Sequence, residues 1–67
     1  MKMVIYKSLG IYCVTTEENY KARIQDARAI QRLPDFNSAE EIINYYCKYF
    51  GNKTEDFIVA DATEGGI

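Results

Sequence analysis

Residues 38–51 read SAEEIINYYCKYFG, and this stretch decides the fold because it carries the strongest helix pattern in the chain. Ser38 with Glu41 three residues later is the pattern of a capping box, and Gly51 suits the left-handed residue that follows a last helical turn. The apolar residues recur at helical spacing and share one side: Ala39, Ile42, Ile43, Tyr46 and Phe50. The sequence therefore predicts an amphipathic helix with one buried side.

Three short segments have the β-branched and aromatic composition of strands. Residues 3–7 and 11–15 flank Ser8, Leu9 and Gly10, and Gly10 can supply the positive φ that a three-residue hairpin turn with a bulge requires, with one long, kinked strand as the alternative. Residues 57–60 follow the helix and have the same character. We expect a hairpin near the N-terminus and a final strand.

A second helix is predicted between the hairpin and Pro34. Thr15 and Glu18 form a capping-box pattern, and residues 17–33 contain no glycine or proline. Tyr20, Ile24 and Ala27 follow the spacing of one helical face. The sequence therefore predicts a helix that runs from Glu17 to Leu33.

Together these elements follow the order ββααβ, which is typical of an α+β fold. We expect a small two-layer domain over residues 1–62, with a three-stranded sheet and two helices on one face. Residues 63–67 are expected to form a flexible C-terminal tail. Because the other sheet face would then expose apolar side chains, we expect a homo-oligomer, a dimer or higher, that covers Val4, Tyr6, Tyr12 and Val14.

The amino-acid composition excludes several classes of protein. The 67 residues carry a net charge of −2, and the longest apolar runs span three or four residues, far short of the ~20 of a membrane helix. No apolar segment follows Lys2 as in a secretory signal, so we expect a cytoplasmic protein without a membrane partner. Cys13 and Cys47 lie in apolar surroundings and are expected to be core thiols, with a disulfide or a reactive site as the alternatives.

Catalytic and cofactor motifs are missing from the sequence. Without histidine the chain has no Ser-His or Cys-His pair and no imidazole ligand. Acidic pairs such as Glu17 with Glu18 are explained by helix N-termini, which favour negative charge. The spacing of the four glycines matches no nucleotide-binding loop, and no metal-ligand spacing occurs. We therefore predict no enzyme activity, no cofactor and no metal, with catalysis by carboxylates alone as a remaining alternative.

Basic residues of the expected first helix are candidates for binding an anionic ligand. On a helical wheel they fall on one stripe or beside it, and a solvated helix face is the alternative interpretation. The candidate ligand-binding residues are Lys21, Arg23, Gln25, Arg28 and Arg32. Nucleic acid is an unlikely partner, because the chain is acidic overall and lacks a broad basic surface.

Tyrosines of the 38–51 helix are candidates for binding a protein. Tyr45 and Tyr49 lie one helical turn apart beside the polar side, and Glu40 and Glu41 add negative charge. Tyrosines at the margin of a core are the alternative interpretation. These four residues are the candidate protein-binding site.

We hypothesise from the sequence a small non-enzymatic binding protein that inhibits a larger host protein. Isoleucine, tyrosine, asparagine and lysine make up 23 of the 67 residues, a composition typical of AT-rich coding. This composition suits a phage or mobile-element protein that antagonises a host defence component. The alternative is a homo-oligomeric sponge that sequesters a small anionic ligand, such as a nucleotide signal, in pockets between subunits.

Overall fold

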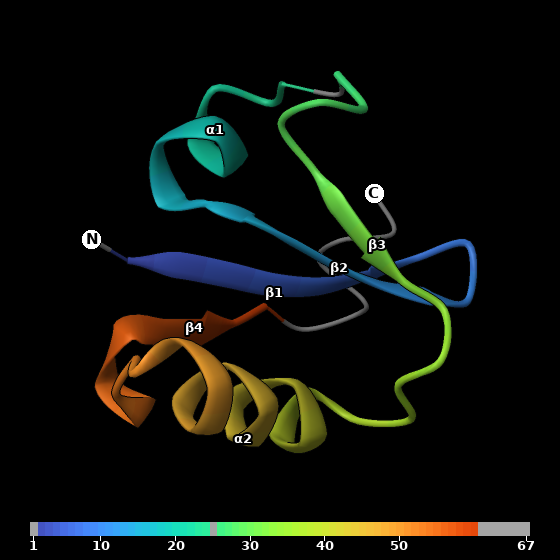
Figure 1. Cartoon of the computed structure of the whole chain (residues 1–67). Coiled ribbons are helices and arrows are strands. Elements are labelled where there is room, and N and C mark those ends of the chain that lie inside the picture. The colour runs from blue at the N-terminus through green and yellow to red at the C-terminus, as the bar shows by residue number, and fades with distance from the viewer. Residues whose placement is uncertain (1, 25, 61–67) are drawn as a thin grey trace.

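The computed structural model describes residues 2–24 and 26–60 and has the expected α+β class (Figure 1). Four strands form one sheet in the order β3-β2-β1-β4, one strand more than predicted. The elements along the chain are β1 (Met3–Ser8), β2 (Ile11–Thr16), α1 (Glu17–Lys21), β3 (Gln31–Leu33), α2 (Ala39–Phe50), the 3-10 helix η1 (Thr54–Asp56) and β4 (Phe57–Val59). The predicted tail and Gln25 lie outside the described residues.

The predicted hairpin is confirmed, but its turn differs from the predicted three-residue turn with a bulge. β1 and β2 pair antiparallel from Met3 opposite Thr16 to Ser8 opposite Ile11, so the turn contains only two residues. Leu9 has φ 52° and Gly10 has φ 79°, the pair of positive φ angles that a type I′ turn requires. This turn matches the right-handed twist of the strands that it joins.

Helix α2 and strand β4 complete the sheet through a parallel connection. β4 pairs parallel to β1, with Phe57 opposite Met3 and Val59 opposite Ile5. Because β3 lies at one edge of the sheet and β4 at the other, α2 crosses one face between them (Figure 1). The helix is capped as predicted, by Ser38 at its start and by Gly51 with φ 72° at its end.

The core lies between α2 and the sheet face beneath it. Ile5 and Ile42 are fully buried, and Val14, Tyr46 and Phe57 complete the cluster. The Tyr46 hydroxyl donates a hydrogen bond of 2.9 Å to Oε1 of Gln31 on β3. This bond lets a buried tyrosine keep its polar end satisfied.

Helix α1 packs on the opposite face of the sheet, which differs from the expected placement of both helices on one face. Successive residues of a strand point to opposite faces, so Tyr6 points away from the face of Ile5. The Tyr6 ring lies 5.3 Å from the ring of Tyr20 on α1. The Thr15 hydroxyl donates a hydrogen bond of 2.8 Å to the Ala29 carbonyl, which holds the following segment on the same face.

The expectation that one apolar face of the sheet is uncovered is therefore wrong. Since Ile5 pairs with Val14 and Lys7 with Tyr12, Val4 and Tyr6 lie on one face, while Tyr12 and Val14 lie on the other. Val4 and Val14 are each 2% exposed within the single chain. The physical reason for expecting a homo-oligomer no longer applies to these residues.

The helix predicted over residues 17–33 begins at Glu17, but Thr16 and not Thr15 caps it, and the prediction is wrong beyond Lys21. The Arg23 N–H donates to the Tyr20 carbonyl at 3.1 Å, and the Ile24 N–H donates to the Asn19 carbonyl at 3.0 Å. These two bonds are those of a Schellman motif, whose left-handed residue is Arg23, with φ 58°. Residues 31–33 then pair with β2 as an edge strand, a long-range interaction that the local helical spacing does not reveal.

Arg23 gives the first testable prediction, because an L-residue in the left-handed region costs about 1–2 kcal/mol and glycine avoids this cost. Arg23 is exposed and its substitution removes no core packing. We expect Arg23→Gly to raise the free energy of unfolding by about 0.5–1 kcal/mol in urea titrations. Ala22→Gly is the matched control, because Ala22 is right-handed, and it should lower the free energy of unfolding. Destabilisation by Arg23→Gly would contradict this account of the helix end.

The raised pKa values of two tyrosines predict that the protein loses stability at high pH. Burial raises the pKa of Tyr46 and of Tyr6 above the ordinary value of 10.0. The folded protein thus holds protons that the unfolded chain releases, so stability is complete below about pH 10 and falls as the pH rises beyond it. Urea titrations between about pH 8 and pH 12 measure this fall.

The Tyr46→Phe variant provides the control for the pH experiment. At neutral pH its free energy of unfolding should fall by about 1 kcal/mol, because the side-chain Oε1 of Gln31 loses its hydrogen-bond donor. Above pH 10 its stability should fall less steeply than that of the unmodified chain. A stability that stays constant up to pH 12 in the unmodified chain would refute the assignment.

Candidate functional site

An aromatic cluster lies on α2 and on the loop before it. Tyr45 is at its centre, with ring centroids of neighbouring residues between 4.9 and 5.9 Å away. The cluster consists of Phe36, Tyr45, Tyr46, Tyr49 and Phe50. The Tyr46 ring also lies 5.6 Å from Phe57, so the cluster is continuous with the core. Neighbouring rings adopt tilted or edge-to-face arrangements, which are favourable for aromatic pairs.

Three members of the aromatic cluster present large surfaces to solvent. The exposed fractions are 40% for Tyr45, 62% for Tyr49 and 64% for Phe50. Single exposed apolar residues are normal on a protein surface, whereas a contiguous group of rings usually marks a contact site. The α2 surface is therefore the strongest candidate for binding a partner.

The start of α2 fixes Phe36 against this cluster. The Ser38 hydroxyl accepts a hydrogen bond of 3.2 Å from the Glu41 N–H, and Glu41 Oε1 accepts one of 2.7 Å from the Asn37 N–H. These bonds hold the turn before the helix, so Phe36 lies edge-on to Tyr45 at 5.4 Å. Glu41 is thus engaged in capping, while Glu40 is exposed and is one of the acids in the first turn.

A shallow hollow of about 380 Å³ lies beside the aromatic cluster. Its lining combines rings with charged and polar groups: Asp35, Phe36, Glu41, Asn44, Tyr45, Lys48 and Tyr49. Lys48 Nζ lies 5.4 Å from the centroid of the Tyr49 ring, a cation–π distance. Lys48 therefore lies over one face of the exposed Tyr49 ring.

The structure brings the four predicted protein-binding residues onto one element. Glu40, Glu41, Tyr45 and Tyr49 all belong to α2, and the last three line the hollow. Sequence reasoning missed Phe36 and Phe50 as members of the same surface. Phe50 lies one turn after Tyr46, and Phe36 lies two residues before the capping Ser38. These positions in the sequence could have indicated that both rings lie near Tyr45.

The predicted ligand-binding residues do not form one stripe in the described part of the chain, because the helix that would align them ends at Lys21. Lys21 pairs with Glu17 at 3.5 Å, and Arg28 pairs with Asp26 at 3.8 Å. Arg23 occupies the left-handed position after α1, and Arg32 lies on β3. Gln25 lies outside the described residues.

Arg32 instead lies near Tyr6 and Cys13, on the sheet face that α1 covers. These three side chains help to line a hollow of about 40 Å³. Burial raises the pKa of the Cys13 thiol, while the positive charge of Arg32 opposes that rise. A thiol with a raised pKa is a poor nucleophile at neutral pH. Cys13 is buried and Cys47 is half-buried, and both are free thiols.

Comparisons with known proteins leave the chain without an assigned family. No family model, no curated protein and no solved structure matches it. Within residues 2–24 and 26–60, no three acidic or cysteine side chains lie close enough together to hold a metal ion. No helix of the described residues is long and apolar enough to cross a membrane.

The geometry of the aromatic cluster predicts different effects on stability for substitution of its two exposed tyrosines, Tyr45 and Tyr49. Tyr45 packs among four other rings, so Tyr45→Ala should lower the free energy of unfolding by about 1–3 kcal/mol. Tyr49 is mostly exposed, so Tyr49→Ala should change it by about 0.5 kcal/mol or less. Urea titration of both variants measures the difference. Equal losses would mean that Tyr49 is part of the core and unsuitable for testing binding.

Proposed function

We propose that the protein is a non-enzymatic binding protein that inhibits a larger macromolecule by docking through the aromatic cluster of α2. The observation that carries this proposal is the continuous group of exposed rings centred on Tyr45. Tyrosine and other aromatic residues are enriched at the energetic centres of interfaces, where rigid rings bury large areas at little entropic cost. Two carboxylates, Asp35 and Glu41, and one ammonium group, Lys48, line the hollow beside the rings, and this excess of negative charge favours a partner surface that carries positive charge.

The size of the chain is sufficient for this role. A stable interface buries about 800 Å² on each partner, a small fraction of the 4999 Å² of accessible surface here. One side of the molecule can therefore hold a partner while the sheet and α1 remain intact. An inhibitor of this kind acts by covering the surface that its target needs.

The shifted pKa values of the described residues support binding over catalysis. Burial raises the pKa of Tyr6, Cys13 and Tyr46, and a hydrogen bond from the Lys53 N–H lowers the pKa of Asp56. Each of these shifts moves the pKa further from neutrality. A general acid or base works best with a pKa near the operating pH, so these groups are poorly suited to that task.

The proposed biological setting follows from composition. An inhibitor of a host defence component, encoded by a phage or another mobile element, fits a very small chain with an AT-rich residue bias. In this setting the protein acts in the host cytoplasm and needs no cofactor. The partner is then a host protein with a basic contact surface.

Site-specific photo-crosslinking tests the proposal. Tyr49→p-benzoylphenylalanine should give one main covalent adduct with a host macromolecule in a lysate of the source cells. The matched control is the same replacement at Leu9, which is 95% exposed but lies at the distant hairpin turn, and it should give no such adduct. An identical adduct from both positions would contradict docking through α2.

Affinity measurements with the captured macromolecule complete the test. Tyr49→Ala and Asp35→Lys should each weaken binding about tenfold or more, which corresponds to about 1.4 kcal/mol, whereas Leu9→Ala should leave it unchanged. Addition of the unmodified protein should abolish the activity of the macromolecule. Binding that is insensitive to Tyr49→Ala would refute the site, and binding without inhibition would refute the inhibitory role.

A further inference from the structure

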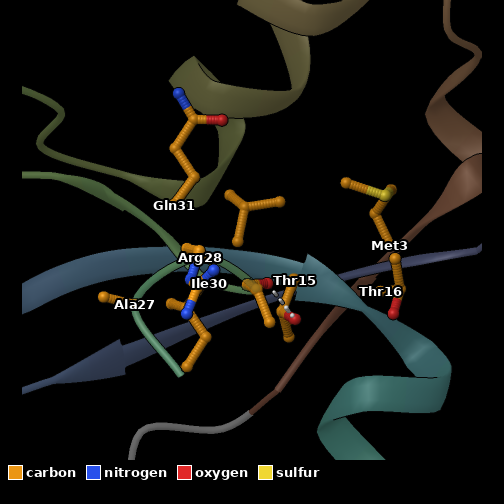
Figure 2. Close-up of a pocket in the computed structure, with 9 residues that line it drawn as sticks. Met3, Thr15, Thr16, Ala27, Arg28, Ile30 and Gln31 are labelled. Carbon is orange, nitrogen blue, oxygen red and sulfur yellow. Dashed lines mark hydrogen bonds between the residues drawn. The ribbon is translucent and has the colours of Figure 1, made fainter. Parts of the chain in front are cut away.

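The hollow beside the aromatic cluster has side chains that converge, unlike a second hollow at the edge of the sheet. That second hollow has a volume of about 410 Å³ and lies between the end of β2 and the segment that leads into β3 (Figure 2). In Figure 2 the side chains of Met3 and Gln31 rise on one side of the strands, while Thr15, Ala27 and Arg28 lie on the other. Its polar side chains therefore cannot hold one small ligand together.

Helical spacing places most of the lining of the hollow beside the aromatic cluster on one side of α2. Residues three and four positions apart share a helix surface. The lining residues from α2 follow this spacing: Glu41, Asn44, Tyr45, Lys48 and Tyr49. Asp35 and Phe36 come from the segment before α2, and the Phe36 ring lies edge-on to Tyr45 at 5.4 Å. These side chains therefore face the same space.

Ring surface in this hollow is open to a ligand. The centroids of the Tyr45 and Tyr49 rings are 4.9 Å apart and the rings are tilted by 47°, so neither ring stacks flat on the other. Both side chains are exposed. Lys48 Nζ lies 5.4 Å from the centroid of Tyr49, so the hollow already contains a cation on an aromatic ring. A cation from a partner would make the same kind of contact.

The carboxylates of the hollow are not neutralised by Lys48. In the described part of the chain, the ion pairs lie within α1 and in the segment between α1 and β3, so Asp35 and Glu41 form none with Lys48. Glu41 Oε1 accepts a hydrogen bond of 2.7 Å from the Asn37 N–H, which fixes the orientation of this carboxylate. The hollow therefore combines exposed rings with unpaired carboxylates, and both attract a cation.

We propose that this hollow binds one arginine side chain of the partner protein. The guanidinium would contact the Tyr45 ring and pair with the Asp35 carboxylate, while Glu41 adds negative charge. Arginine suits these groups better than lysine, because its planar guanidinium stacks on aromatic rings and pairs with a carboxylate through two parallel hydrogen bonds. This inference rests on the proposed function and deepens it by naming the chemical group that the partner contributes.

Lys48 limits the affinity of the hollow for arginine. Its ammonium group lies over the Tyr49 ring and repels a second cation nearby. The Lys48 side chain is exposed and forms no ion pair with the described carboxylates, so it can move aside at little cost. Removal of its charge should therefore tighten the binding of arginine.

Titration of the isotope-labelled protein by NMR tests the site with three capped amino acids at constant ionic strength. The probes are the N-acetyl methylamides of arginine, lysine and norleucine, which supply a guanidinium, an ammonium group and no charge. We expect the arginine probe to give saturable shifts of the Tyr45 and Tyr49 backbone amides and of the Asn44 side-chain amide, at a Kd on the order of 10 mM. The lysine probe should bind about threefold more weakly, and the norleucine probe should give no saturable shift.

Matched variants distinguish this site from general attraction to an acidic chain. Asp35→Asn should weaken binding of the arginine probe about threefold, the scale of an exposed ion pair, and Lys48→Gln should strengthen it by a similar factor. Glu40→Gln is the control, because it removes an exposed carboxylate of α2 that lies outside the hollow, and it should leave binding unchanged. All three positions are exposed, so none of the changes removes core packing.

Three results would overturn the proposal. They are the absence of a saturable shift with the arginine probe, equal binding of the lysine or norleucine probe, and equal effects of Asp35→Asn and Glu40→Gln. Because the probes are single amino acids, this experiment needs no partner protein. Failure of the arginine site would therefore leave docking through the rings to the crosslinking experiment, and absence of a crosslinked adduct would leave the result with the probes unchanged.

Discussion

The packing of α2 on one face of the sheet is the contact on which the rest of the structure depends. Ile42 and Tyr46 supply the helix side of this core, against Ile5, Val14 and Phe57 from three strands. Each buried apolar side chain of this size contributes about 1.5–3 kcal/mol, so loss of the layer would remove most of the stability of so small a chain. The same contact brings β4 beside β1, because α2 is the connection between the two edges of the sheet.

The sequence predicted correctly those elements whose first and last turns are set by residues close to them in the chain. Ser38, Glu41 and Gly51 define α2 from within, and the strand composition around Gly10 defines the hairpin. The helix predicted over residues 17–33 failed because its end depends on Arg23, a residue type that seldom adopts a left-handed conformation. The edge strand β3 then forms through pairing with β2, which helical periodicity cannot indicate.

The same distinction between local and long-range structure explains which site residues could be predicted. Tyr45 and Tyr49 belong to a helix whose first and last residues were predicted correctly, so they lie one turn apart in the structure as expected. The basic residues were predicted to lie on one long helix. That helix ends at Lys21, so these residues do not share one face in the structure. Arg28 lies instead in the segment before β3, where its exposed side chain pairs with Asp26.

In this small chain, residues of the core and residues of the proposed docking surface lie next to one another on the same helix. Tyr46 is 9% exposed and belongs to the core, Tyr49 is mostly exposed, and Tyr45 between them contacts both. Rings that pack on one another lose little side-chain freedom when a partner binds, because the core already holds them in place. The packing of α2 on the sheet therefore orders the aromatic cluster in the free protein, which would lower the entropic cost of the docking that we propose.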